Sequence, residues 1–167
     1  MPLNIDEIRV KISAVKIFLF DLQGVLIPEN ENGRSERFDL IESLKEFNDF
    51  CLKNNLSCGI ITGISEGEIL NEIQRVGGIE IVSASLDKVS AAEKITAKKS
   101  CGLNEAFFMG DGLLDLPLLN KVGLSAAPET AARQIKKSVD FICPGKTGAE
   151  RLEFILSLLK NVAVQLN

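Results

Sequence analysis

Short apolar runs alternate along the chain with longer stretches in which apolar residues recur every three or four positions. The short runs are typical of buried strands, and the longer stretches are typical of helices that bury one face. We predict strands at 14–20, 57–61, 79–83, 106–109, 124–127 and 140–143, and helices at 38–54, 65–76, 88–101, 116–122, 129–137 and 148–164. At the start of the second helix, Ser65 and Glu68 have the spacing of a capping box.

This alternation predicts one fold class. Apolar strands that alternate with amphipathic helices form a doubly wound, mainly parallel α/β sheet with helices on both faces, as in Rossmann-like folds. A length of 167 residues suits one domain, and no repeat, low-complexity tract or linker interrupts the pattern. We therefore expect a single domain over residues 1–167.

Polar residues follow the predicted strands at the positions where such folds bind ligands. Right-handed crossovers place the carboxyl ends of all strands at one edge of the sheet, and ligands bind outside that edge. Asp21 follows the first strand, Thr62 the second and Asp111 the fourth. Lys88 follows the third strand after a short loop. The pattern predicts a site at this edge.

Two of these positions could take part in phosphoryl transfer. A carboxylate such as Asp21, at a strand end and before a glycine turn, can attack phosphorus and become an acyl phosphate, although an aspartate also commonly starts a turn. The Thr62 hydroxyl and the Gly63 N–H could hold a phosphate oxygen, or the pair could form an ordinary turn. Their shared placement after strands favours the functional interpretation.

Three further residues have an electrostatic or a structural interpretation. Lys88 could neutralise a bound phosphate, or it could be a solvated lysine at a helix start. Asp111, between two glycines, could bind Mg²⁺ with help from Asp115. Asp115 is also suited to cap the helix that contains Pro117, and the sequence does not separate these two roles.

The composition narrows the chemistry. The chain has no histidine, which excludes Ser-His-Asp and Cys-His catalysis and the commonest zinc sites. The remaining acids, lysines and hydroxyls favour hard cations such as Mg²⁺. A net charge of -4 argues against nucleic acid or an acidic membrane as the main partner.

The same composition predicts a cytoplasmic protein. The longest apolar runs have about six residues, which is too short for a membrane span, and the first ten residues do not resemble a secretory signal. The four cysteines are scattered, without a CxxC pair, and we expect them to be reduced thiols.

The ordered motifs resemble those of a known family. The haloacid dehalogenase superfamily has four such motifs, and this chain is similar to them at FLFDLQGVL, IITG, DK and MGDGLLDLP. The chain resembles the superfamily's capless branch most, which includes 3-deoxy-manno-octulosonate 8-phosphate phosphatases and sialic-acid-type sugar phosphatases. The segments KVGLSAAPETA and GKTGAERLEFIL resemble later parts of that branch, so the likeness covers about residues 15–160.

The resemblance implies roles for particular residues. Asp21 would be the nucleophile and, with the Gln23 carbonyl and Asp111, a ligand of Mg²⁺. Thr62 and Lys88 would hold the phosphate and stabilise charge during its transfer. The substrate would be a small phosphorylated metabolite, such as a sugar-acid phosphate. The branch has no cap domain and covers its site with neighbouring subunits, so the resemblance implies a homotetramer.

Gln23 is the main departure from the family pattern. It stands where the family has a second aspartate, the general acid and base, and a carboxamide cannot exchange protons in this way. General acid–base catalysis contributes about 10²- to 10⁴-fold, or roughly 3 to 5.5 kcal/mol of barrier. The nucleophile and metal ligands remain, so Gln23 predicts a slow phosphatase.

Other departures concern substrate recognition. Gly112 replaces an aspartate that is common in the branch, and Thr147 replaces an arginine of the tail, although Arg151 remains as a candidate substrate ligand. The segment IPENENGRSERF is too short for the branch's protruding hairpin, and an expected Arg-Asp-Gly stretch is absent. Recognition of a sugar acid is therefore weakened.

Two functions from different classes remain. One is an enzyme, a slow phosphatase. The other is a catalytically degenerate assembly module, like the phosphatase-like domain of animal acylneuraminate cytidylyltransferases. Gln23 and Gly112 favour the module. The enzyme is favoured by the retained set Asp21, Thr62, Lys88 and Asp111. A Rossmann-type nucleotide binder is disfavoured because the GxGxxG motif is absent.

Overall fold

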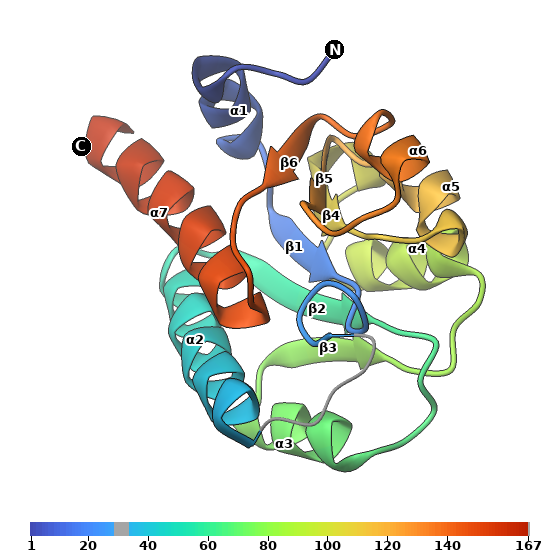
Figure 1. The fold of residues 1–167 in the computed structure, drawn as a ribbon. Helices are drawn as coiled ribbons and strands as arrows, with labels where there is room; N and C mark the ends of the chain where they lie inside the picture. Colours follow the sequence, from blue (N-terminus) through green and yellow to red (C-terminus); the bar gives the residue numbers. More distant parts are fainter. Residues whose placement is uncertain (29–33, 167) are drawn as a thin grey trace.

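A six-stranded sheet forms the centre of the molecule in the computed structural model, which describes residues 1–28 and 34–166 (Figure 1). All neighbouring strands pair in parallel, in the order β3-β2-β1-β4-β5-β6. The strands are β1 (Ile17–Phe20), β2 (Ser57–Ile61), β3 (Ile79–Val82), β4 (Ala106–Met109), β5 (Leu124–Pro128) and β6 (Phe141–Cys143). The predicted fold class is confirmed.

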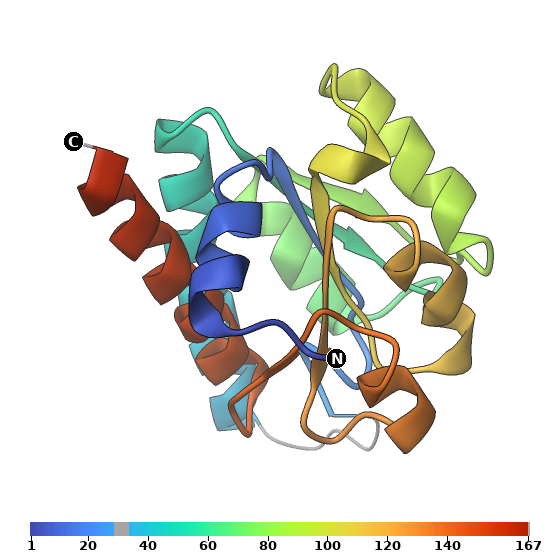
Figure 2. The same cartoon turned by 90° about the horizontal axis from the view of Figure 1, so that it is seen from above.

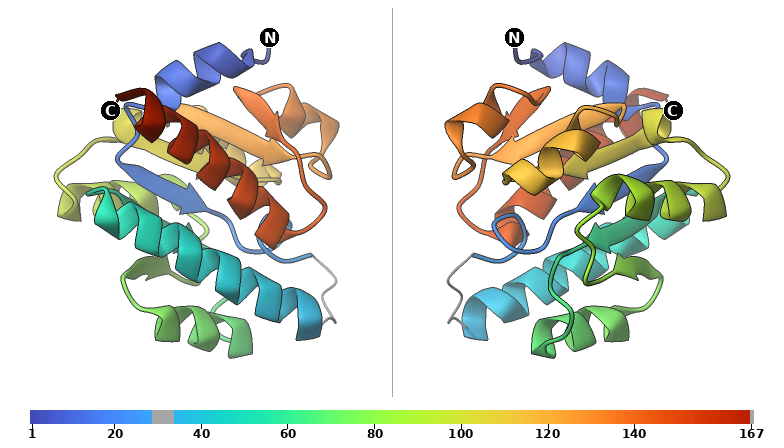
Figure 3. Two further views of the ribbon diagram at one scale, coloured as in Figure 1. Left: turned by 90° about the vertical axis from the view of Figure 1, so that its left-hand side faces the viewer. Right: turned by 90° about the vertical axis from the view of Figure 1, so that its right-hand side faces the viewer.

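Helices cover both faces of the sheet, as Figures 2 and 3 show. The hydrophobic cores assign α1, α2, α3 and α7 to one face and α4, α5 and α6 to the other. The helices are α1 (Ile5–Ile12), α2 (Arg34–Lys53), α3 (Glu68–Val76), α4 (Lys88–Lys98), α5 (Leu116–Leu119), α6 (Arg133–Lys136) and α7 (Gly148–Leu166), with short 3-10 helices η1 (Leu103–Glu105) and η2 (Leu113–Asp115).

Strand β1 lies in the middle of the sheet and is buried on both sides. Phe18 and Phe20 belong to the core under α2 and α7, whereas Ile17 and Leu19 belong to the core under α4 and α5. Phe47 of α2 packs edge to face on Phe18 and Phe20, with ring centroids 5.6 and 5.5 Å away. Two well-packed cores therefore fix the strand whose end bears Asp21.

The structure contradicts the predicted start of α3. This helix begins at Glu68 with Gly67 as its N-cap, without a side-chain capping bond, so the Ser65–Glu68 capping box was wrong. The Glu68 carboxylate lies 2.8 Å from the Arg37 guanidinium instead. The Ile64 carbonyl accepts a hydrogen bond from the Ala84 N–H, which holds the chain extended before the helix.

Other element boundaries also differ. Helix α1 was not predicted, although Asn4 and Glu7 form its capping box. Helix α2 begins at Arg34 rather than at 38, and α5 and α6 are shorter than predicted because turns occupy their flanks. The hairpin region considered in the sequence falls partly on residues 29–33, which lie outside the described residues.

Between the described parts of β1 and α2, the chain has one isolated bridge, Gln23 to Ile27, and no cap domain is seen there. None of the helices in residues 1–28 and 34–166 combines the length and apolar character that a membrane crossing requires. The four cysteines are free thiols, and burial raises the pKa of Cys51 and of Cys143 to about 12.

Candidate active site

The predicted site residues lie on four neighbouring loops. Asp21 follows β1, Thr62 follows β2, Lys88 opens α4 and Asp111 follows β4. Residues Phe20, Ile60 and Met109 are in register across the three paired strands, so the loops that follow leave the sheet at the same level. The sheet therefore gathers these residues at one edge, as the sequence predicted.

A buried ion cluster forms the centre of this edge. The Lys88 ammonium lies 2.9 Å from Oδ1 of Asp21 and 2.5 Å from Oδ1 of Asp115. Asp21, Lys88 and Asp115 are exposed by only 7%, 6% and 1%. Their charges are therefore largely shielded from water, which makes their interaction strong and any missing partner costly.

Burial and neighbouring charges shift the pKa values of Asp21 and Lys88. Burial and the charge of Asp115 raise the pKa of Asp21 to about 7, against the opposing effect of Lys88. Burial lowers the pKa of Lys88, but the charges and hydrogen bonds of Asp21 and Asp115 outweigh it, so the net shift is upward. Part of both shifts comes from the charge of Asp115 beside Asp21 and Lys88, which a bound cation would offset.

Asp115 organises the loop that carries Asp111. Its Oδ2 accepts hydrogen bonds from the backbone N–H groups of Asp111 and Gly112, at 2.9 and 3.0 Å. Asp115 is also the N-cap residue of α5, as one of its two interpretations had it, but its carboxylate turns back to the loop and to Lys88 and makes no cap bond to that helix. A Cβ on Gly110 would lie 2.6 Å from the Cβ of Asp115, so the loop needs glycine there.

Gly24 lets the Asp111 carboxylate approach the turn after β1. Its φ is +80°, and an added Cβ would lie 1.9 Å from Oδ2 of Asp111. Any other residue would be strained and would collide with the carboxylate. The sequence shows a glycine turn after Asp21 but not this contact, since only the fold shows which side chain occupies the space.

Three carboxylates could hold a metal ion. Asp21, Asp111 and Asp115 each offer an oxygen, and these oxygens lie within 4.8 Å of one another. Carboxylates are the ligands that Mg²⁺ prefers, so the donor set fits the predicted cofactor. Asp115 already binds one ammonium and two N–H groups, so its role as a ligand would compete with these bonds.

The phosphate-binding candidates are placed suitably. The buried Thr62 accepts a hydrogen bond from the Ile64 N–H through Oγ1, at 3.1 Å, which leaves its own hydroxyl proton to donate. Gly63 beside it is exposed. The Leu22 N–H donates to Oδ1 of Asp21 at 2.8 Å, and Oδ2 of Asp21 has no hydrogen-bond partner among the described residues. Oδ2 is thus the oxygen available for attack.

A cavity of about 450 Å³ opens beside the ion cluster. It is reached through Gly24, Asp111 and Gly112, whereas Asp21, Thr62 and Lys88 do not line it. The cavity is therefore a chamber next to Asp21 rather than around it. Its further lining residues are Leu26, Ile27, Pro28, Glu36, Arg37, Thr130, Ala132, Lys146, Thr147, Gly148 and Arg151.

Arg151 connects helix α7 to the turn after β1. Its Nη1 donates a hydrogen bond to the Val25 carbonyl at 2.7 Å, and the side chain is buried against the cavity. Its Nε has no hydrogen-bond partner among the described residues. The predicted substrate ligand therefore lies at the cavity with an unused donor. Gln23 is exposed, two residues after Asp21.

Comparison with known proteins agrees with this arrangement. The model of the haloacid dehalogenase-like hydrolase family matches residues 31–148. A 3-deoxy-D-manno-octulosonate 8-phosphate phosphatase from Salmonella typhi is 26% identical over 158 residues, which covers 87% of this chain and 80% of the relative. The corresponding phosphatase from Escherichia coli K12 is 26% identical over 163 residues, covering 90% and 82%.

Solved structures show the same fold. A phosphatase of the same name from Moraxella catarrhalis, in complex with magnesium, phosphate and KDO, has a TM-score of 0.79 at 24% identity and covers 98% of both chains. The cobalt-bound form of a Haemophilus influenzae deoxy-D-mannose-octulosonate 8-phosphate phosphatase has a TM-score of 0.75 at 19% identity and covers 92% of both chains.

We predict that Asp115→Ala destabilises the metal-free protein by about 3 kcal/mol. This is the lower end of the range for breaking a buried ion pair, because Asp21 still accompanies Lys88. Urea unfolding in a chelating buffer measures the change. The exposed Asp49→Ala on α2 is the matched control and should stay within about 0.5 kcal/mol of wild type. Equal stability of the two variants would show that Asp115 does not organise the loop.

Proposed function

Because the chain belongs to the haloacid dehalogenase-like hydrolase family, we propose that it hydrolyses a small phosphorylated metabolite through a phosphorylated Asp21, with Mg²⁺ as cofactor. The observation that carries this proposal is the Asp21 carboxylate, which is buried, bound by Lys88 through one oxygen and open at the other. A catalytically degenerate assembly module has no physical need to keep the Asp21 carboxylate buried beside two further carboxylates.

The chain's own groups divide the work of phosphoryl transfer. Oδ2 of Asp21 attacks phosphorus, the bond from phosphorus to the leaving oxygen breaks, and water later hydrolyses the acyl phosphate. Lys88 stabilises charge on the transferring oxygens, and the Thr62 hydroxyl with the Gly63 N–H orients them. Mg²⁺ held by Asp21, Asp111 and the Gln23 carbonyl would offset the excess negative charge and lower the pKa of Asp21.

The substrate class follows from the relatives and from the cavity. The relatives are named for a sugar-acid phosphate, and a chamber of about 450 Å³ next to the nucleophile suits a small metabolite. Gly112 and Thr147, which replace charged residues of the branch, both line this chamber. We therefore propose a small phosphorylated metabolite, with a sugar-acid phosphate as the candidate that the relatives suggest.

Gln23 makes the proposed enzyme slow and keeps a second candidate function open. Its amide lies two residues after the nucleophile and cannot protonate a leaving oxygen or activate water. A catalytically degenerate assembly module would tolerate this substitution. We propose a cytoplasmic homotetramer in either case. The exposed Leu86, Leu113 and Leu114 on the loops around Lys88 and Asp111 support coverage of this edge by another subunit.

We expect Mg²⁺ to raise the melting temperature, because it binds the folded carboxylate cluster and not the dispersed carboxylates of the unfolded chain. At a Mg²⁺ concentration of about a hundred times the dissociation constant, the free energy of unfolding would rise by about 2.7 kcal/mol. Thermal scans with and without Mg²⁺ measure it, and Asp111→Asn should remove most of the gain, whereas Asp39→Asn on the exposed side of α2 should not. Calorimetry without Mg²⁺ binding at millimolar concentration would refute the cofactor.

We expect Gln23→Asp to raise turnover of a sugar phosphate by about ten- to a thousandfold, because it restores a proton-transfer group to an otherwise complete site. Asp21→Asn should abolish turnover in both backgrounds, since an amide is a poor nucleophile and a poor Mg²⁺ ligand. Release of inorganic phosphate across a panel of sugar phosphates measures both. If Gln23→Asp gains nothing and Asp21→Asn leaves assembly unchanged, the module replaces the enzyme.

We expect a tetramer in solution. Because the described residues include no cap domain over the site, coverage must come from neighbouring subunits. Multi-angle light scattering at micromolar concentration gives the mass directly, and the 18.2 kDa chain makes monomer, dimer and tetramer easy to separate. A monomer over the whole concentration range would contradict this expectation.

A further inference from the structure

Among the described residues, the site offers no group placed to give a proton to a leaving oxygen. The chain has no histidine, and the amide of Gln23 does not exchange protons near neutral pH. Lys88 lies 2.9 Å from Asp21 and 2.5 Å from Asp115, so two of its three N–H groups already have acceptors. Asp115 uses both oxygens to accept hydrogen bonds. Among the described residues around the nucleophile, none is therefore set up as a general acid.

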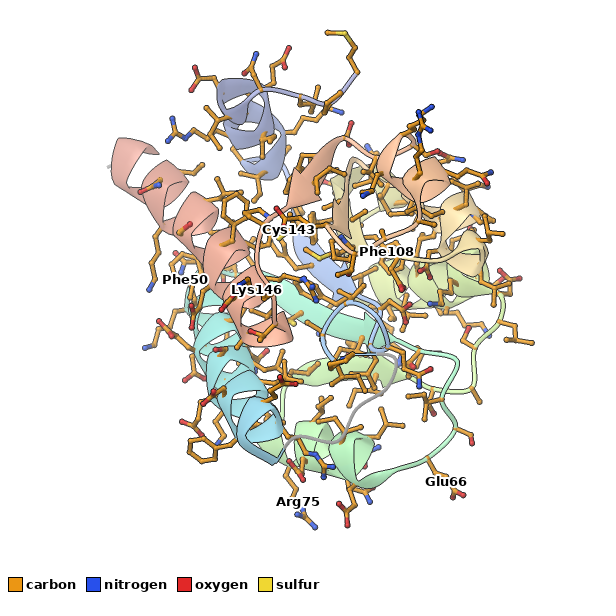
Figure 4. The ribbon with its side chains drawn as sticks, in the orientation of Figure 1. Phe50, Glu66, Arg75, Phe108, Cys143 and Lys146 are labelled. Atoms are coloured by element: carbon orange, nitrogen blue, oxygen red, sulfur yellow. The ribbon has the colours of Figure 1, made fainter. Side chains whose placement is uncertain are left out.

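The neighbouring chamber offers positive charge instead. Arg37, Lys146 and Arg151 line it, against the carboxylates of Glu36 and Asp111. Glu68 and Glu72 neutralise Arg37 in part, at 2.8 and 3.5 Å. Lys146 is exposed in the segment between β6 and α7, where Figure 4 labels it.

Arg151 adds an independent indication of an anionic ligand. Its side chain is only 5% exposed, it lines the chamber, and its Nε has no hydrogen-bond partner among the described residues. A buried guanidinium at the wall of the chamber places a positive charge where an anion could bind.

We infer that the substrates this site turns over well are acyl phosphates, whose leaving oxygen departs as a carboxylate anion and needs no proton. The inference rests on the proposed function, since it assumes phosphoryl transfer to Asp21. A carboxylate is a weak base in water and is stable as an anion, unlike the alkoxide that an alkyl phosphate would release. The absence of a general acid at Gln23 then matters little for the first step. The cations of the chamber stabilise the negative charge of the leaving carboxylate.

The transfer balances without a proton donor. Oδ2 of Asp21 forms a bond to phosphorus, and the electron pair of the broken P–O bond stays on the carboxylate that leaves. The products are one acyl phosphate on Asp21 and one free carboxylate, so one mixed anhydride replaces another. In the second step water adds to phosphorus, its proton passes to bulk solvent or to phosphate, and the Asp21 carboxylate is released.

The second step has no base to activate water, so phosphorylated Asp21 should accumulate. The two steps are therefore measured separately. The ratio kcat/KM reports transfer to Asp21, and kcat is limited by hydrolysis of the phosphorylated enzyme. Acetyl phosphate and ethyl phosphate are suitable probes because they have the same two-carbon size and differ in the basicity of the leaving oxygen.

The decisive experiment compares both probes in wild type and in Gln23→Asp, with Mg²⁺ present. We expect Gln23→Asp to raise kcat/KM for ethyl phosphate about ten- to a thousandfold and to change it for acetyl phosphate by less than about threefold. Intact-mass measurement of wild type with acetyl phosphate should show one added phosphoryl group, which Asp21→Asn abolishes. An equal gain on both probes would overturn the inference.

A second arm tests the positive charge of the chamber. Lys146→Gln should lower kcat/KM for acetyl phosphate about three- to tenfold, and Lys121→Gln, an exposed lysine outside the chamber, should leave it unchanged. Lys146 is exposed, so its replacement should not unfold the protein. An unchanged kcat/KM for Lys146→Gln would remove the role of the chamber in receiving the anion.

The outcomes separate this inference from the proposed function. If neither probe reacts in wild type or in Gln23→Asp, and no phosphorylated enzyme forms, phosphoryl transfer to Asp21 is refuted. The inference and the proposed function are then both wrong. If wild type hydrolyses ethyl phosphate as readily as Gln23→Asp does, the site has a proton donor after all. Loss of that activity in Glu36→Gln would identify it as Glu36, the remaining chamber acid. That result overturns the inference and leaves the phosphatase intact.

Discussion

The buried contact between Lys88 and the carboxylates of Asp21 and Asp115 is the constraint on which the site depends. Each of these charges would be costly to bury alone, and the cluster is tolerable because one ammonium serves two carboxylates. Asp21 comes from β1, Lys88 from the start of α4 and Asp115 from the end of η2. The contact therefore joins three loops, and it keeps the Asp21 carboxylate in one position before any ligand arrives.

The packing of the sheet makes that position rigid. Strand β1 is central, and aromatic rings from α2 and β4 hold its Phe18 and Phe20. Beyond the strand, Gly24 allows the Asp111 carboxylate against the turn, and Arg151 binds the same turn from α7. Elements that are far apart in the sequence thus hold the short turn after Asp21 in place. A small displacement of that turn would move the carboxylates of Asp21 and Asp111 apart.

The sequence predicted the strand ends well because their determinants are local. Continuous apolar runs such as 106–109 can only be buried strands in this setting, and the residue after each run necessarily lies at the ligand edge. Helix starts were less predictable, as α3 shows. Ser65 and Glu68 have a favourable local pattern, but Arg37 of α2 pairs with the Glu68 carboxylate, and the Ala84 N–H binds the carbonyl of Ile64 just before Ser65. Such contacts are tertiary and have no local signal.

The role of Asp115 was also hard to predict from the sequence, because it depends on tertiary contacts. Asp115 had two local interpretations of equal merit, and the choice depended on Lys88, which lies 27 residues earlier in the chain. The contact of Gly24 with Asp111 and the unused Nε of Arg151 were likewise invisible without the fold. Gln23 is the opposite case, because the chemical consequence of an amide is evident from its identity alone. The structure adds that the other buried groups of the ion cluster are already engaged, since Lys88 contacts Asp21 and Asp115, and Asp115 accepts hydrogen bonds from two backbone N–H groups.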